Sequence, residues 1–249
     1  MGIGQDDDIA PANVEKALEM GVPLIETAPP HGRPLAIVGG GPSFLDRLDE
    51  LRKWPDIWAI NGAARELRDC GIESVAVSVD PNAEQWEQFD GVGEGLFASC
   101  CTAQIFEMYA GRCRMFHLDT VDGEGIRAQG GPTTAARMHY AAFNLGYGEI
   151  HYFGCESSYE GGTHAYDYTD PGPDLVIEAD GKRYPTKPYL ILQAEYLSEL
   201  MREFPQVFKN RSGGLLGAMI ERPDTWGIVE AADELQQYLK PYDKEGSTP

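Results

Sequence analysis

Short apolar runs alternate with helical patterns through most of this sequence, and this alternation restricts the fold more than any single motif. The runs are rich in β-branched and aromatic residues, as strands buried on both faces are. We expect strands at residues 35–39, 57–61, 74–80, 95–99, 113–118 and 149–154. Helical spacing occupies the intervals at residues 43–53, 63–70, 82–89, 102–109 and 133–144. This order predicts an α/β fold with a Rossmann-like, doubly wound, mainly parallel sheet and helices on both faces.

The alternation also divides the chain into three parts. Residues 1–33 are polar and rich in proline, and they predict an N-terminal arm with a short helix at 13–20 that Asn13 caps. The main domain is expected at residues 34–221. Residues 222–249 predict one amphipathic helix followed by a polar tail.

A turn-rich stretch with three tyrosines, residues 155–174, follows the last strand of the alternation. Long irregular segments in compact domains usually serve as lids or binding loops, so we expect a loop-rich lid here. After the lid the pattern predicts a hairpin that turns at Asp180 and Gly181, a helix at 189–204 and a strand at 207–211.

The composition excludes several classes of partner. Forty Asp and Glu residues against twenty Lys and Arg give a formal net charge of −20 at pH 7, which disfavours nonspecific binding to nucleic acid and to anionic membranes. No apolar stretch approaches the ~18 residues of a membrane span, and the first residues are acidic where a secretory signal is basic. The five cysteines show no C-x-x-C spacing, which argues against disulfides and zinc. We therefore expect a cytoplasmic protein with reduced thiols.

The segment Gly39-Gly40-Gly41-Pro42-Ser43 lies between the first expected strand and a helix. Glycines let backbone amides approach an anion closely, and the start of a helix directs its N–H groups and its positive dipole end to the same place. The segment is therefore expected to bind a nucleotide phosphate, and a side chain at Gly41 is expected to block that approach. The alternative is a tight turn in which Ser43 caps the helix.

Two further strands end in polar residues, Asn61-Gly62 and Asp80. Because the carboxyl ends of parallel strands line the ligand crevice of open α/β sheets, Asn61 and Gly62 are candidate nucleotide contacts. Asp80 is a candidate for catalysis, for metal binding or for contact with a ribose hydroxyl. The alternative for Asp80 is a cap on the helix that follows.

A second glycine turn and the last strand end extend the candidate site. Gly131 and Thr133 precede an expected helix and repeat the anion-binding pattern. The last strand leads into Glu156, Ser158 and Tyr159. Glu156 is a candidate general base or metal ligand, and Ser158 and Tyr159 are candidate nucleotide contacts.

Two residues of the expected lid are candidate catalytic groups. His164 has the chemistry of an acid, a base or a phosphate ligand, and Tyr166 has that of a group that protonates or orients a leaving phosphate. A lone loop histidine is more often a surface residue, so its neighbours carry the argument. Gln193 on the later helix is placed either at the far side of the crevice or, more simply, on a solvent-facing helix.

The segments AIVGGGPSF, WAINGA, SVAVSVDP, GGPTTAARMHYAAFNLGYGEIHYFGCESSY and HAY resemble the MptE-like family, typified by archaeal 6-hydroxymethylpterin diphosphokinase. The likeness is strongest to its phage- and prophage-type members and covers about residues 34–216. The same order of elements is similar to bacterial CMP-sialic acid sialyltransferases and to flagellin-modifying motility accessory factors.

The resemblance implies a Rossmann-like nucleotide site. The family's phosphate and nucleotide contacts correspond to Gly39, Gly41, Pro42, Ser43, Asn61, Gly131 and Thr133. Asp80 falls at the family's Asp-Pro, and Tyr159 and Tyr166 loosely match tyrosines that assist departure of the nucleotide monophosphate in the sialyltransferases. The chain departs from the pattern at Glu156, where the families usually carry Asp, and only His164 is available to match the sialyltransferase histidine.

Three functions stay open at this point. The first is Mg²⁺-assisted diphosphoryl transfer from ATP to a hydroxyl acceptor, with the ion between Asp80 and Glu156, because bare carboxylates repel phosphates. The second is sialyltransferase-like glycosyl transfer from a nucleotide sugar. The third is noncatalytic nucleotide binding. The expected partners are a nucleotide and a small hydroxyl-bearing acceptor, and the sequence leaves open whether the arm and the C-terminal helix join two copies in a homo-oligomer.

Overall fold

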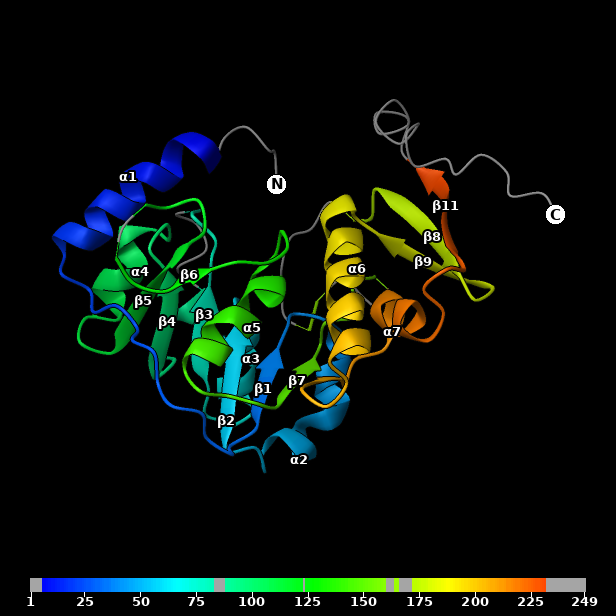
Figure 1. Ribbon diagram of the computed structural model, residues 1–249, viewed down its shortest axis with the longest axis horizontal. Helices are drawn as coiled ribbons and strands as arrows, with labels where there is room; N and C mark the ends of the chain where they lie inside the picture. The colour runs from blue at the N-terminus through cyan, green and yellow to red at the C-terminus, as the bar shows by residue number, and fades with distance from the viewer. Residues whose placement is uncertain (1–5, 83–87, 123, 160–163, 166–171, 232–249) are drawn as a thin grey trace.

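Figure 1 shows the protein as a computed structural model, which describes residues 6–82, 88–122, 124–159, 164–165 and 172–231. A central sheet with helices on both sides takes up most of the chain, and a smaller antiparallel sheet lies beside it. In this part of the chain, no helix has the length and apolar character needed to cross a membrane.

Eight strands form the central sheet in the order β10-β7-β1-β2-β3-β4-β5-β6, and neighbouring strands pair in parallel. Their bounds are β1 (Leu35–Val38), β2 (Asp56–Ile60), β3 (Val75–Ser78), β4 (Glu94–Ala98), β5 (Cys113–Leu118), β6 (Arg127–Ala128), β7 (Ile150–Phe153) and β10 (Phe208–Asn210). Strands β1 and β7 are buried at every position, which explains why β1 is wholly apolar and β7 is apolar or aromatic except at His151. The expected α/β, Rossmann-like fold is confirmed.

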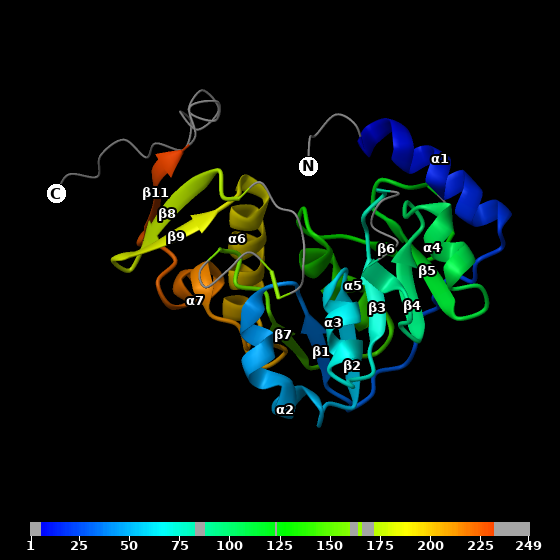
Figure 2. The same cartoon turned by 180° about the vertical axis from the view of Figure 1, so that it is seen from behind.

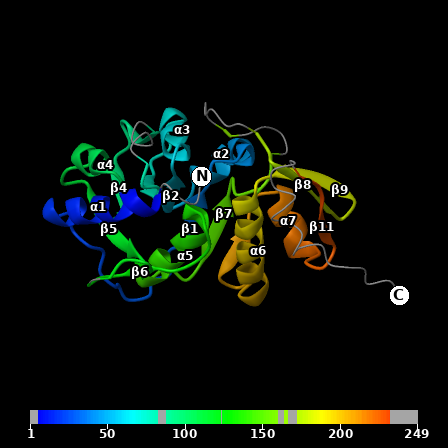
Figure 3. The same ribbon diagram turned by 90° about the horizontal axis from the view of Figure 1, so that it is seen from above.

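Helices cover both faces of this sheet. Seen from above, α2 and α3 lie on one side of the sheet and α5 and α6 on the other (Figure 3). The bounds are η1 (Pro42–Arg47, a 3₁₀ helix), α2 (Leu48–Leu51), α3 (Ala63–Asp69), α4 (Ala103–Met108), α5 (Thr134–Asn144), α6 (Pro188–Glu203) and α7 (Gly214–Glu221). Apolar side chains from the helices and the central sheet form one continuous buried cluster.

One expected helix is divided, and a second expected helix and the expected lid lie partly outside the described residues. The helix expected at 43–53 is divided into η1 and α2, and a non-helical backbone at the N-cap of α2 (φ −118°) separates the two. Residues 83–87 of the helix expected at 82–89 lie outside the described residues. The same holds for residues 160–163 and 166–171 of the expected lid.

The N-terminal helix differs from its expected form. α1 (Asp6–Glu19) begins earlier than the helix expected at 13–20, and Asn13 lies inside it rather than at its cap. The Asn13 side chain instead donates hydrogen bonds to the carbonyl oxygens of Pro81 (3.0 Å) and Cys100 (2.9 Å). Because these carbonyls follow β3 and β4, the bonds hold α1 at the carboxyl end of the sheet (Figure 1).

The expected hairpin at residues 180–181 is present. β8 (Leu175–Ala179) and β9 (Lys182–Thr186) are antiparallel neighbours. Asp180 and Gly181 join them with φ angles of 51° and 71°, the left-handed conformations that a two-residue hairpin turn of type I′ requires. Apolar side chains on the inner face of this hairpin pack with those of α6 and α7 in a second buried cluster.

The prediction of a C-terminal helix from residue 222 is wrong over residues 226–231. These residues form β11 (Trp226–Ala231), which pairs antiparallel with β8 and completes a three-stranded sheet in the order β11-β8-β9. The physical reason is that β8 offers an open edge, and pairing satisfies backbone groups that a short isolated helix holds only weakly. Residues 232–249, the remainder of that helix and the tail, lie outside the described residues.

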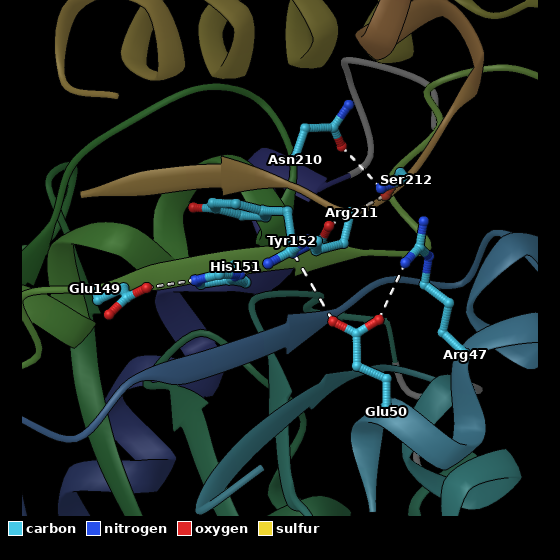
Figure 4. A network of polar contacts seen from close by, with 8 residues as sticks. All are labelled: Arg47, Glu50, Glu149, His151, Tyr152, Asn210, Arg211 and Ser212. Atoms are coloured by element: carbon cyan, nitrogen blue, oxygen red, sulfur yellow. Dashed lines mark hydrogen bonds and ion pairs between the residues drawn. The ribbon is translucent and has the colours of Figure 1, made fainter. Parts of the chain in front are cut away.

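A chain of polar contacts connects β7 to the helices on one face of the sheet (Figure 4). His151 Nε2 lies 2.8 Å from a Glu149 carboxylate oxygen, and the Arg211 Nε–H donates to His151 Nδ1 at 3.0 Å. Because Nδ1 accepts this bond, the ring is neutral and carries its proton on Nε2. Arg211 also faces Glu50, which pairs with Arg47.

Buried histidines are expected to make the protein less stable at mildly acidic pH. Burial lowers the pKa values of His117, His139 and His151, so the unfolded chain takes up protons near pH 6.5 while the folded chain resists them. The free energy of unfolding therefore falls as pH drops through about 6.5. Urea unfolding at pH 7 and pH 5.5 measures this, and the variant His117→Asn should show a shallower decline. Equal stability at both pH values would contradict the prediction.

Candidate functional site

The order of the strands reverses between β1 and β7. β2 to β6 lie on one side of β1, and β7 and β10 lie on the other. Open parallel sheets bind ligands outside the carboxyl ends of the strands at such a switch point. A cavity of about 400 Å³ lies there, lined by residues that follow β1, β2, β3 and β7, by the first turn of α5 and by α6. β1, β2 and β3 run in the same direction toward this end (Figure 2), and Ala10 of α1 adds to the lining.

Gly39, Gly40 and Gly41 line the cavity as expected, but the protein itself takes up two of their amides. The Gly39 N–H donates to the Phe153 carbonyl oxygen at 2.8 Å, and the Gly41 N–H donates to that of Gly154 at 2.9 Å. The loop therefore fastens the end of β1 to the end of β7. A ligand phosphate meets fewer free amides here than the sequence predicts.

The Glu156 carboxylate occupies the start of η1. Its Oε1 accepts a hydrogen bond from the Ser43 N–H at 2.7 Å, its side chain is buried, and its Oε2 has no hydrogen-bond partner among the described residues. A Cβ atom at Gly41 would lie 1.6 Å from Oε2, so only glycine leaves room for this carboxylate. The negative charge at the helix start thus comes from the chain itself. Ser43 and Pro42 are not among the described cavity-lining residues.

Asn61 and Asp80 reach the cavity from the ends of β2 and β3. Asn61 has a φ of 49°, which is unusual for a residue with a side chain, and its buried Oδ1 has no hydrogen-bond partner among the described residues. Asp80 is buried and accepts a hydrogen bond from the Asn82 N–H at 3.0 Å, a contact within the turn that follows β3. Gly62 precedes α3 and is not among the lining residues of the described chain.

The first turn of α5 is the side of the cavity best suited to an anion. Thr133 is its N-cap, and the Thr133 Oγ1 accepts a hydrogen bond from the Ala136 N–H at 3.3 Å. Thr134 and Ala135 also line the cavity, and first-turn amides have no acceptor within their own helix. Gly131 is not among the cavity-lining residues of the described chain. It packs against α5, because a Cβ atom at Gly131 would lie 3.0 Å from the Ala136 side chain.

Two cations that the sequence analysis did not select lie in or near this cavity, and only the first of them lines it. Arg137 lines the cavity, pairs with Asp119 at 2.8 Å and donates to the Ala128 carbonyl oxygen at 3.2 Å. The buried Lys187 has its Nζ 5.9 Å from the ring centre of Tyr159, another lining residue. The signal that would have identified Arg137 is its position one turn into a helix that follows a glycine turn.

Gln193 on α6 connects two walls of the cavity. The Thr133 hydroxyl donates to Gln193 Oε1 at 2.6 Å, and Gln193 Nε2 donates to the Ser157 hydroxyl oxygen at 2.9 Å. Gln193 is only 6% exposed, so its placement on a solvent-facing helix is wrong. The sequence signal for this inward position is that Gln193 lies on the same side of the helix as the apolar residues Ala194 and Leu197. Ser157 carries no signal in the sequence.

Of the remaining expected residues, three line the cavity and one lies outside the described residues. Ser158 and Tyr159 line the cavity, and the Ser158 hydroxyl oxygen lies 3.4 Å from the Leu215 N–H that donates to it. His164 also lines the cavity. Its neighbour Ala165 donates its N–H to the Gly40 carbonyl oxygen at 2.9 Å, which ties this part of the chain to the glycine loop. Tyr166 lies outside the described residues.

Cys155 also lines the cavity, but its environment disfavours a nucleophilic role. Burial, reinforced by the neighbouring Glu156 carboxylate, raises the pKa of the Cys155 thiol. The thiol therefore stays protonated near neutral pH, whereas thiolate is the nucleophilic form.

A magnesium ion between Asp80 and Glu156 stays a prediction. The two residues follow β3 and β7, with β1 and β2 in between. In the described ranges, no three or more His, Cys, Asp and Glu side chains gather into a metal-binding group.

The geometry thus brings ten of the fifteen expected residues to one cavity. They are Gly39, Gly40, Gly41, Asn61, Asp80, Thr133, Glu156, Ser158, Tyr159 and His164. The resemblance to the MptE-like family stays a prediction, because no protein-family model, no curated protein and no solved structure matches the chain.

Proposed function

We propose that the protein is a nucleotide-dependent transferase that binds its donor in the switch-point cavity and passes a group to a small hydroxyl-bearing acceptor. The observation that carries the proposal is the combination of that cavity with the first turn of α5 and Arg137. Amides at a helix start and a guanidinium both donate to phosphate oxygens. With a formal net charge of −20 on the whole chain, an anion is attracted by these few donors at short range rather than by the charge of the protein as a whole.

The first candidate reaction is diphosphoryl transfer from ATP to a hydroxyl acceptor. The resemblance to the diphosphokinase family supports it. Asp80 and His164 both line the cavity, and either side chain has the chemistry to take the proton of the acceptor hydroxyl. Glu156 is less suited to that task, because Oε1 is already held by the Ser43 N–H.

The second candidate is glycosyl transfer from a nucleotide sugar, and a specific observation favours it. Two of the amides in the first glycine loop donate to the carbonyl oxygens of Phe153 and Gly154 at the end of β7, and the Ser43 amide donates to Glu156. One anion-binding wall, at α5, therefore remains where two were expected. A donor with a single phosphate needs only one such wall, whereas a triphosphate gains from two.

A thermal-shift panel tests the proposal and separates the candidates. ATP, GTP, CTP, CMP-sugars and UDP-sugars are added with and without Mg²⁺, and the matched nucleosides serve as controls that lack the phosphate. A nucleotide at about 100 times its Kd adds roughly 2.7 kcal/mol of stability, which raises the Tm of a domain of this size by about 5–10 °C. The nucleosides should give a much smaller rise.

Each outcome has a distinct meaning. A shift that is largest with ATP and Mg²⁺ favours diphosphoryl transfer, and one with a CMP- or UDP-sugar in the absence of metal favours glycosyl transfer. Binding without turnover on any hydroxyl acceptor favours a noncatalytic nucleotide-binding protein. If no nucleotide shifts the Tm more than its nucleoside, the proposed function is wrong.

A further inference from the structure

Ser157 is held in a conformation that serine rarely adopts. Its φ is 58°, and within the described residues only two other non-glycine residues, Asn61 and Asp180, have positive φ. Asp180 belongs to the hairpin turn, whereas Asn61 and Ser157 both line the cavity. Strained backbone positions of this kind persist where the surrounding structure holds them, and they concentrate at functional sites.

Two hydrogen bonds from other elements hold Ser157 in place. The Thr186 hydroxyl at the end of β9 donates to the Ser157 carbonyl oxygen at 2.8 Å. Gln193 Nε2 on α6 donates to the Ser157 hydroxyl oxygen at 2.9 Å. Ser157 is 4% exposed, so its hydroxyl has little contact with bulk water in the described structure.

The orientation of Gln193 determines where the Ser157 proton goes. Thr133 Oγ1 accepts from the Ala136 N–H and donates its own proton to Gln193 Oε1. The amide oxygen of Gln193 therefore faces Thr133, and its NH₂ group must face Ser157. Since the Ser157 oxygen acts as the acceptor in that contact, its proton is directed elsewhere, and no acceptor for it is seen in the part of the chain that the structure describes.

We propose that Ser157 is a ligand-contacting residue that donates its hydroxyl proton to a phosphoryl oxygen of the bound molecule. The proposal rests on the proposed function and adds a named contact to it. One amide group, that of Gln193, separates the Ser157 hydroxyl from the N-cap of α5. A phosphoryl group at the first turn of α5 thus lies beside this hydroxyl, and phosphate oxygens only accept hydrogen bonds. In a site with little water such a bond is strong.

The variant Ser157→Gly tests the contact. Glycine adopts a positive φ without strain, so this variant is expected to fold while lacking the hydroxyl. The matched control is Ser198→Ala, which removes a buried hydroxyl on α6 that donates to the Glu195 carbonyl oxygen. Calorimetry measures the Kd of each protein for pyrophosphate, as the probe of the phosphoryl site, and for the nucleotide with the largest thermal shift.

Loss of a hydrogen bond to a charged oxygen should weaken the binding of Ser157→Gly to both probes by about 10- to 100-fold. Ser198→Ala should bind like the wild type. If Ser157→Gly binds pyrophosphate and the nucleotide as tightly as the wild type, or if Ser198→Ala loses as much affinity, the contact is disproved and the proposed function is untouched.

The pyrophosphate probe keeps this inference separate from the proposed function. If the wild type binds pyrophosphate but no nucleotide, and Ser157→Gly loses that binding, the Ser157 contact is supported and the nucleotide-dependent transferase is wrong. A wild type that binds neither probe overturns both.

Discussion

Gly41→Val is expected to destabilise the protein by about 3 kcal/mol or more, and to lower its Tm by roughly 10 °C. Gly41 has φ −72° and ψ 149°, angles that any residue adopts, so the effect does not come from the backbone. It comes from the Cβ atom, which would lie 1.6 Å from Glu156 Oε2 and 2.9 Å from the Gly154 carbonyl oxygen. The Glu156 carboxylate must then leave the Ser43 N–H and stay buried without that donor.

Urea unfolding of single and double variants checks this explanation. Gly148→Ala is the control, because a Cβ there meets nothing within 4 Å. The double variant Gly41→Ala with Glu156→Ala should be less destabilised than the sum of its single changes, since removing the carboxylate also removes the clash. Additive effects would show that the clash with Glu156 is not the cause.

The fold could be predicted from the sequence because its elements are locally encoded. The six runs expected as strands each overlap a strand of the central sheet, and burial explains why apolar residues dominate them. The hairpin was predictable for the same reason, since Asp180-Gly181 is a turn signal in itself. β11 was not predictable, because its conformation depends on the edge of β8 and that edge is formed only in the folded chain.

The site was predictable in its location but not in its chemistry. Residues that follow parallel strands converge at one edge of the sheet, so Asn61 and Asp80 could be selected from their positions alone. The glycine loop offers fewer free amides than the sequence predicts, because those of Gly39 and Gly41 donate to the carbonyl oxygens of Phe153 and Gly154, more than a hundred residues away in the chain. Arg137 was missed, and the inward position of Gln193 could not be chosen over the solvent-facing one, for a similar reason: what a helix faces depends on how it packs.

Arg137→Glu is expected to weaken nucleotide binding by about 100-fold, the second large effect that follows from the structure. Arg137 lines the cavity beside the first turn of α5, where the proposed donor phosphate binds. The change removes a cation and introduces a carboxylate that repels the phosphate at short range. Arg137→Gln, which only removes the charge, should weaken binding by about 10-fold. Calorimetry at low and at high salt measures both Kd values.

Asp119→Asn is the matched control for this pair. Asp119 pairs with the Arg137 guanidinium at 2.8 Å and is 41% exposed, so the substitution removes the partner and leaves the cation in place. Nucleotide binding should then be unchanged or tighter, because the guanidinium no longer shares its charge with a carboxylate. An Asp119→Asn variant that binds as weakly as Arg137→Glu would mean that the ion pair acts only on the structure of α5. In that case the donor phosphate is not held by Arg137, and the amides of the first turn of α5 must bind it without a cation.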